Sequence, residues 1–140
     1  MAEIKEAPQT AQQLEQSLSR AIESLYISKL GQQPSQITCQ FFEAKLAIVL
    51  EESLTHLEQL LIGAEQNKTA QRMRATLNRS LQNRISRLLE EMAGVAVIDF
   101  LSSTTFATRR TGIIVVFQDA PAVNNPYVIP KYKSLKSTKD

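Results

Sequence analysis

The chain has 140 residues, of which 43% are hydrophobic and 21% charged, and its formal net charge is +2. This length suits one domain with a single core, and so small a net charge does not by itself indicate binding to nucleic acid or to a membrane. Cys39 is the one cysteine, which excludes an internal disulfide and suits a reducing cytosol. No stretch approaches the ~18 consecutive apolar residues of a membrane span, and the first residues do not resemble a signal peptide. The sequence predicts a cytoplasmic protein.

The first third of the chain predicts a helix followed by a hairpin. Residues 1–9 are expected to form a flexible lead-in. Thr10 and Gln13 have the spacing of a capping box, and apolar residues then recur every three or four positions, as in an amphipathic helix. Apolar and polar residues next alternate over 37–41 and 46–50, which predicts two strands joined as a hairpin.

Two helices are predicted in the middle of the chain. Thr55 and Glu58 repeat the capping-box spacing and open a short helix, which is expected to bury three leucines. These leucines are Leu57, Leu60 and Leu61. Apolar residues at helical spacing then predict a long helix between residues 70 and 92.

The last third predicts a second hairpin and a tail. Apolar runs over 95–101 and 113–117 indicate strands, and residues 119–140, which are rich in proline and lysine, are expected to be disordered. The order α-β-β-α-α-β-β predicts an α+β two-layer sandwich, in which helices cover a four-stranded, mainly antiparallel sheet. The residues from 10 to 118 are expected to form this single domain.

The long helix has an outward basic face. Six basic residues and no acid lie between residues 66 and 89, and three of the six lie opposite the apolar stripe. These three are Lys68, Arg72 and Arg79. They are candidates for contact with an acidic protein, nucleic acid or anionic lipid, and the alternative is a solvated helix face.

Arg84 is different, because its angle around the helix falls within the apolar stripe. A buried arginine requires a partner, and Asp99 and Glu43 are the acids expected to supply one. Alternatively, this part of the helix lies at the domain edge or in an interface.

The stretch FLSSTTFATRRTG, residues 100–112, is rich in hydroxyl groups and contains Arg109 and Arg110. A phosphate-binding loop would lead into a helix, but a strand follows this stretch. The residues therefore predict a hairpin whose strands extend into the stretch and whose turn lies around 107–110. Arg109 and Arg110 are expected to be exposed at its tip, where they are further candidates for contact with a partner.

No group of residues predicts a catalytic, metal or cofactor site. His56 has no second histidine near it and is expected at the surface near a helix cap, while Cys39 alternates with apolar residues and is expected to be buried. There is no glycine-rich phosphate loop. The sequence thus predicts a protein that is not an enzyme and has no cofactor.

Several short motifs together resemble a known family over residues 14–118. They are Gly31-Gln-Gln-Pro34 before a strand, Leu54-Thr55 before a helix with Glu58, the arginine-bearing long helix, Glu90-Glu91-Met-Ala-Gly94, Leu101-Ser102-Ser103, and Ile114-Val115-Val116-Phe117. In this order they resemble the MpsC-like domain, also known from YbcI-type bacterial proteins. The family's name ties it to a sodium-translocating, membrane-potential-generating system, and related genes lie near inorganic-carbon uptake systems.

The resemblance implies a non-enzymatic accessory or regulatory protein, with membrane transporter subunits as partners and a location peripheral to the cytoplasmic membrane. The alternative from the residues is a nucleic-acid-binding protein that uses Lys68, Arg72 and Arg79. Modest net charge and few aromatic residues disfavour that alternative. A small enzyme or anion sensor that uses residues 102–110 ranks third. A homodimer is also expected, since a two-layer domain leaves a sheet face or edge strands uncovered.

Overall fold

The structure is a computed structural model that describes residues 9–131. Most of the expected lead-in, residues 1–8, and the end of the expected tail, residues 132–140, lie outside the described residues. In chain order the elements are α1 (Ala11–Leu30), β1 (Gln36–Phe42), β2 (Lys45–Glu51), α2 (His56–Gly63), α3 (Asn67–Ala93), β3 (Val97–Thr105), β4 (Arg110–Phe117) and the short 3-10 helix η1 (Pro126–Val128). The predicted order of helices and strands is confirmed.

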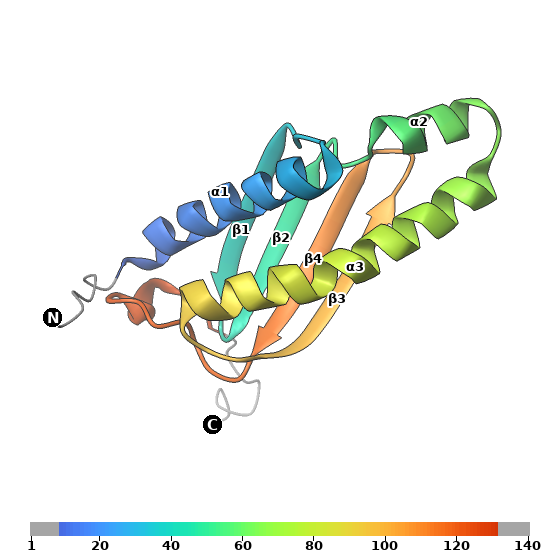
Figure 1. The fold of residues 1–140 in the computed structure, drawn as a ribbon. Coiled ribbons are helices and arrows are strands. Elements are labelled where there is room, and N and C mark those ends of the chain that lie inside the picture. The colour runs from blue at the N-terminus through green and yellow to red at the C-terminus, as the bar shows by residue number, and fades with distance from the viewer. Residues whose placement is uncertain (1–8, 132–140) are drawn as a thin grey trace, which may run out of the picture.

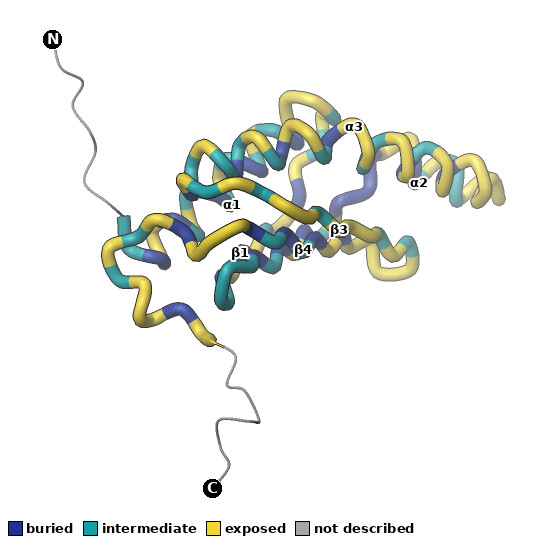
Figure 2. The backbone as a smooth tube through the Cα atoms, turned by 90° about the horizontal axis from the view of Figure 1, so that it is seen from below, coloured by how far each residue is buried: buried dark blue, intermediate teal, exposed yellow. Residues whose placement is uncertain are grey.

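The four strands form one antiparallel sheet in the order β1-β2-β4-β3. Figure 1 shows α1 and α3 running across the sheet, and Figure 2 shows that both lie on the same side of it. The predicted α+β two-layer arrangement is therefore confirmed. The pairing of β2 with β4 joins the two hairpins, which leaves β1 and β3 as the edges.

The core lies between the helices and one face of the sheet. Phe41, Leu46 and Val115 sit side by side across three strands, and each is fully buried. The stripe of α1 packs onto this layer through Leu14, Leu18, Ile22 and Tyr26. On the other face, over which no helix of the described chain lies, Val49 and Leu101 are 38% and 56% exposed.

The start of α1 confirms its predicted capping box. Thr10 Oγ1 accepts a hydrogen bond from Gln13 N, and Gln13 Oε1 accepts one from Thr10 N, each at 3.0 Å. Gly31 and Gly94 end α1 and α3 with φ angles of 66° and 73°. Side chains other than glycine rarely adopt this left-handed conformation, so these residues fix where the two helices stop.

The β3–β4 hairpin also follows the prediction. Its strands reach Thr105 and resume at Arg110, so the turn contains only residues 106–109. Arg109 takes a positive φ of 60° in this turn. The hydroxyl-rich stretch is thus mainly strand.

The segment after β4 differs from the expected disordered tail, because its first part packs on the domain. Ile129 is only 5% exposed and belongs to the core. Asn125 Oδ1 accepts a hydrogen bond from Ala11 N (2.7 Å) at the start of α1, and Pro130 O accepts one from Glu43 N (2.7 Å) after β1. A single buried isoleucine and these polar contacts are not visible in the composition of the segment.

Candidate functional site

A buried ion pair holds the start of α2 against α3. Arg74 Nε and Nη2 lie 2.7 and 2.6 Å from the two carboxylate oxygens of Glu58, which gives a two-pronged contact. The side chains are 3% and 0% exposed. A buried pair needs further hydrogen bonds to offset its lost hydration. Thr55 donates two to Glu58, from N at 2.8 Å and Oγ1 at 2.9 Å, and Arg74 donates one to Ser53 O at 2.9 Å.

The pair belongs to a closed ring of hydrogen bonds that joins α3 to the sheet. Arg74 donates to Asn78 Oδ1 (3.3 Å), and Asn78 Nδ2 donates to Thr104 Oγ1 (3.4 Å). The hydroxyls of Thr104 and Thr111 are 2.7 Å apart, as are those of Thr111 and Ser53. Ser53 O accepts from Arg74, which closes the ring. Throughout the described chain, every buried side-chain polar atom has a partner.

Tyr26 of α1 lies against this ring. Burial raises the pKa of its hydroxyl above the ordinary value of 10.0, although the neighbouring Arg74 and Thr111 lower it in part. The phenol is therefore neutral at physiological pH and can act as both donor and acceptor.

The structure corrects the prediction for Arg84. Arg84 is exposed and lines a groove between α1 and α3, so its expected burial against Asp99 or Glu43 is wrong. The buried arginine is Arg74, which faces inward between Ala70 and Leu81, and its partner is Glu58. The prediction failed because it assumed that α3 turns only apolar residues inward. The helix is instead rotated about its axis so that the charged side chain of Arg74 faces the interior.

The same ion pair explains a second wrong prediction, the burial of the α2 leucines. Glu58 is the buried residue of α2, whereas Leu57 and Leu60 are 53% and 69% exposed and Leu61 is half-buried. Turning Glu58 toward Arg74 necessarily turns its neighbours outward, since adjacent residues on a helix differ by ~100°.

One of these leucines borders an apolar hollow of about 350 Å³ at the end of the molecule. The hollow lies where the end of α1, the start of α2 and the first half of α3 meet. Its apolar part is formed by Leu30, Leu57, Met73 and Leu77, and its polar rim by Lys29, Gln32, Thr55 and His56. Exposed apolar surface of this kind often marks a site of protein contact.

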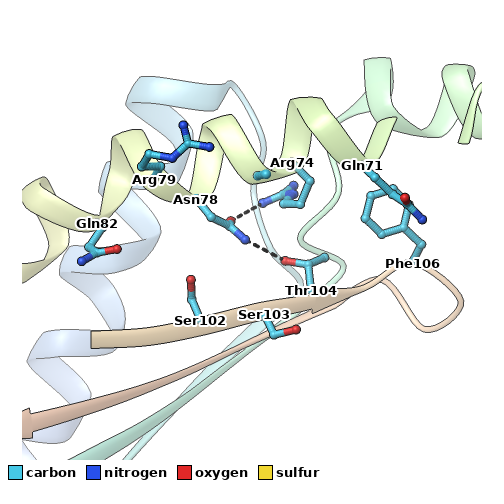
Figure 3. Close-up of a pocket in the computed structure, with 10 residues that line it drawn as sticks. Gln71, Arg74, Asn78, Arg79, Gln82, Ser102, Ser103, Thr104 and Phe106 are labelled. Atoms are coloured by element: carbon cyan, nitrogen blue, oxygen red, sulfur yellow. Dashed lines mark hydrogen bonds between the residues drawn. The ribbon is translucent and has the colours of Figure 1, made fainter. Parts of the chain in front are cut away.

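An open cleft of about 610 Å³ adjoins the buried ring, between α3 and the edge strand β3 (Figure 3). Amides and hydroxyls form most of its lining, with Arg79 and the inner Arg74 as its charged residues. Ser102 points toward α3 and Ser103 points away from it. Since both border the cleft, it extends over the free edge of the strand. The remaining lining residues are Gln71, Ala75, Asn78, Gln82, Thr104 and Phe106.

The structure places the three candidate residues of the long helix, Lys68, Arg72 and Arg79, on one exposed face of α3, here called the basic face. Arg84 and Arg87 are also exposed on this helix. None of these five cations forms an ion pair with any residue of 9–131. The basic face therefore carries positive charge that is not neutralised locally.

The other two candidates, Arg109 and Arg110, lie on the β3–β4 hairpin and not on α3. The side chain of Arg109 is exposed, while its carbonyl oxygen accepts a hydrogen bond from Ser53 N at 2.9 Å. Arg110 Nε lies 2.7 Å from Glu51 Oε1 on β2. The candidates thus fall into two separate groups, and in the second group only Arg109 has a side chain without an ion pair among the described residues.

The two other residues considered for chemistry take the structural positions expected of them. His56 is exposed as the first residue of α2, and Cys39 is 7% exposed in β1. Burial raises the pKa of the Cys39 thiol to about 11. In the described part of the chain, His, Cys, Asp and Glu residues form no group of three that could hold a metal ion. Its helices also include none with the length and apolar character needed to cross a membrane.

Comparison with known proteins gives a family match. The model of the family described as Na+-translocating membrane potential-generating system (MpsC) matches residues 10–119. No curated protein and no solved structure matches the chain significantly. The matched range runs from the N-cap of α1 to just past β4, so it contains the sheet, the buried ring and the basic face. The chain therefore belongs to the MpsC family.

Proposed function

We propose that the protein is a non-enzymatic accessory or regulatory component of a membrane system that translocates cations, and that it binds a membrane subunit through the basic face of α3. The family name supports the association with a sodium-dependent membrane-potential system. Binding through this face is supported by Lys68, Arg72 and Arg79, which are exposed on one helix and form no ion pair with any described residue. Such a surface attracts an acidic segment of a partner.

The chemistry of the cleft favours binding over catalysis. Within the described part of the chain, its lining offers amide, hydroxyl and guanidinium groups and no carboxylate, histidine or thiol. Glu58, the carboxylate nearest to it in the buried ring, has both oxygens occupied by Arg74 and Thr55. A general base needs a free oxygen within reach of a substrate proton.

The proposed location is the cytoplasmic side of the membrane, where the protein is held by its partner. The apolar hollow beside Leu57 and Met73 is a suitable anchor for an apolar side chain of that partner. The homodimer stays a prediction, for which the uncovered sheet face around Val49 and Leu101 offers the surface.

Nucleic acid is the alternative partner, because phosphate groups would meet the same cations. The sequence of α3 contains no aromatic residue on which bases could stack. This favours an acidic protein over a single-stranded nucleic acid.

The test is retrieval of membrane subunits from native membranes by the tagged, full-length protein. The variant Arg72→Glu/Arg79→Glu reverses two charges of the basic face. The matched control Arg20→Glu/Lys131→Glu reverses two exposed charges elsewhere. We expect the wild type and the control to retrieve subunits of an ion-translocating complex, and the α3 variant to lose them. Retrieval that is equal for all three proteins, or that yields no such subunit, would count against the proposal.

A further inference from the structure

The strand β3 is an open sheet edge. It has nine residues, Val97–Thr105, and it pairs with β4 alone. Apart from its pairing with β4, the backbone from residue 98 to residue 105 makes no hydrogen bond to any element of the described chain. An antiparallel strand paired on one side leaves a row of N–H and C=O groups free on the other.

The opposite edge of the sheet is protected near the end of β1. Phe41 N in β1 donates a 2.8 Å hydrogen bond to Glu15 Oε2 of α1. Just beyond β1, Glu43 N donates to Pro130 O of the C-terminal segment. The chain thus protects β1 with a carboxylate and a backbone segment, as sheets commonly protect their edges.

At β3 such protection is confined to the first three residues. Val97 N donates a 2.8 Å hydrogen bond to Glu90 Oε2 of α3, a bulge lies between Val97 and Asp99, and Asp99 carries a charge. The six strand residues that follow, 100–105, carry no charge, and no described segment covers their free side. An uncharged and open stretch of edge strand is a template for another strand, so this part of β3 is available to a partner.

The cleft beside β3 specifies what kind of strand fits. Gln71 and Gln82 on α3 and Ser102 on β3 supply hydrogen-bonding groups to it (Figure 3). The charge of Arg74 is balanced by Glu58, but that of Arg79 is not balanced by any described residue. Among residues 9–131, no carboxylate borders the cleft. Its net positive charge therefore favours acidic side chains.

We propose that the free edge of β3 binds an extended, acidic segment of a partner protein, which pairs with the strand and lies in the cleft against α3. The inference rests on the proposed function, because it names the kind of segment that the accessory protein would bind in its partner. Main-chain pairing supplies affinity, and the cleft selects the side chains.

The probe is a fluorescent ten-residue peptide of alternating valine and glutamate. Binding to the full-length protein is followed by fluorescence anisotropy at low salt, and the bound site is mapped by amide hydrogen exchange. We expect exchange of the amides between residues 98 and 105 to slow by about tenfold or more at saturation. The same peptide with methylated backbone nitrogens should bind about tenfold more weakly or worse, because it cannot donate to β3.

A pair of adjacent substitutions controls for side-chain effects. Ser102→Phe fills the cleft, whereas Leu101→Phe places the same ring on the uncovered face of the sheet, away from the cleft. Both residues are exposed, so thermal unfolding should show two folded proteins. We expect the first variant to lose peptide binding by about tenfold and the second to keep it within about twofold.

Three outcomes would overturn the strand-addition proposal. The first is no peptide binding at low salt. The second is binding that is equally strong for the methylated peptide and slows amide exchange only in α3. That result would leave the proposed function of the basic face intact. The third is protection of β3 in the protein alone that grows with protein concentration, because a second copy would then occupy the edge. Loss of membrane retrieval with intact peptide pairing would instead contradict only the membrane role.

Discussion

At the scale of single residues, Arg74 and Glu58 decide how α2 and α3 meet. Removing one partner leaves the other charge buried without compensation, which typically costs roughly 3–5 kcal/mol. We therefore expect Arg74→Met and Glu58→Gln each to lower the free energy of unfolding by about that amount in urea titrations. The double variant Glu58→Leu/Arg74→Met should lose much less than the sum, since it leaves no unpaired charge.

Arg72→Met is the control for this cycle, because Arg72 is exposed two residues away on the same helix. Its substitution should change stability by no more than about 0.5 kcal/mol. If Arg74→Met were as mild as Arg72→Met, the buried ring would not be a structural element of the protein.

Cys39 gives the fold a pH dependence in the alkaline range. Its pKa rises from an ordinary value of 9.0 to about 11 on folding, so the unfolded chain releases the thiol proton first. The stability from this group is fully present below pH 9 and is lost as the pH rises toward 11. We expect the free energy of unfolding to fall by about 2 kcal/mol between pH 8 and pH 10.5 through this group.

The measurement compares urea unfolding of the wild type and Cys39→Ala at these two pH values. Tyr26, whose pKa is also raised, contributes to the decline in both proteins. The wild type should therefore lose more stability than the variant. Equal losses in the two proteins would show that the thiol is not buried in the way described.

At the scale of elements, the C-terminal segment is an integral part of the domain. Ile129 is buried in the core, whereas Tyr127, two residues earlier, is 80% exposed. We expect Ile129→Ala to cost roughly 2–4 kcal/mol of stability and Tyr127→Ala to cost less than about 0.5 kcal/mol. Thermal or urea unfolding checks both values.

A second readout follows from the contact between Asn125 and Ala11. If Ile129→Ala loosens the segment, the Ala11 amide should exchange its hydrogen faster, because it loses its acceptor. Equal stability of the two variants would mean that the segment lies on the domain without holding it.

Local signals predicted the elements well. The capping boxes at Thr10 and Thr55 and the alternation in the strands each depend on neighbours within a few residues, so the sequence displays them directly. The extent of β3 was also predictable, because Thr104 and Thr105 favour extended backbone.

Features that depend on distant residues were not predictable in the same way. The inward turn of Arg74 requires Glu58, sixteen residues earlier, and it reversed the expected burial of Leu57 and Arg84. The docking of Ile129 likewise needs a gap in the core that only the folded chain creates. The exposed positions of Lys68, Arg72 and Arg79 followed from helical periodicity, but the cleft beside them did not, since it forms between two elements.

At the scale of the whole molecule, the helical layer and the open sheet offer different surfaces. The exposed cations of α3 and the apolar hollow lie on the helical layer. The uncovered sheet face instead carries the paired charges of Glu51 and Arg110 and is partly apolar around Val49. Charge attracts a partner over about 8–10 Å at physiological salt, and apolar contact then holds it. The two surfaces therefore allow a membrane partner on one side and a second copy on the other.

The amount of membrane subunit retrieved through the basic face tests the central claim most directly. The account predicts that the tagged protein retrieves subunits of an ion-translocating complex, and that rising salt weakens this retrieval. It also predicts that Arg72→Glu/Arg79→Glu lowers the yield by about tenfold or more, while Arg20→Glu/Lys131→Glu stays within about twofold of the wild type. A yield that is independent of salt and equal in the two variants would contradict it.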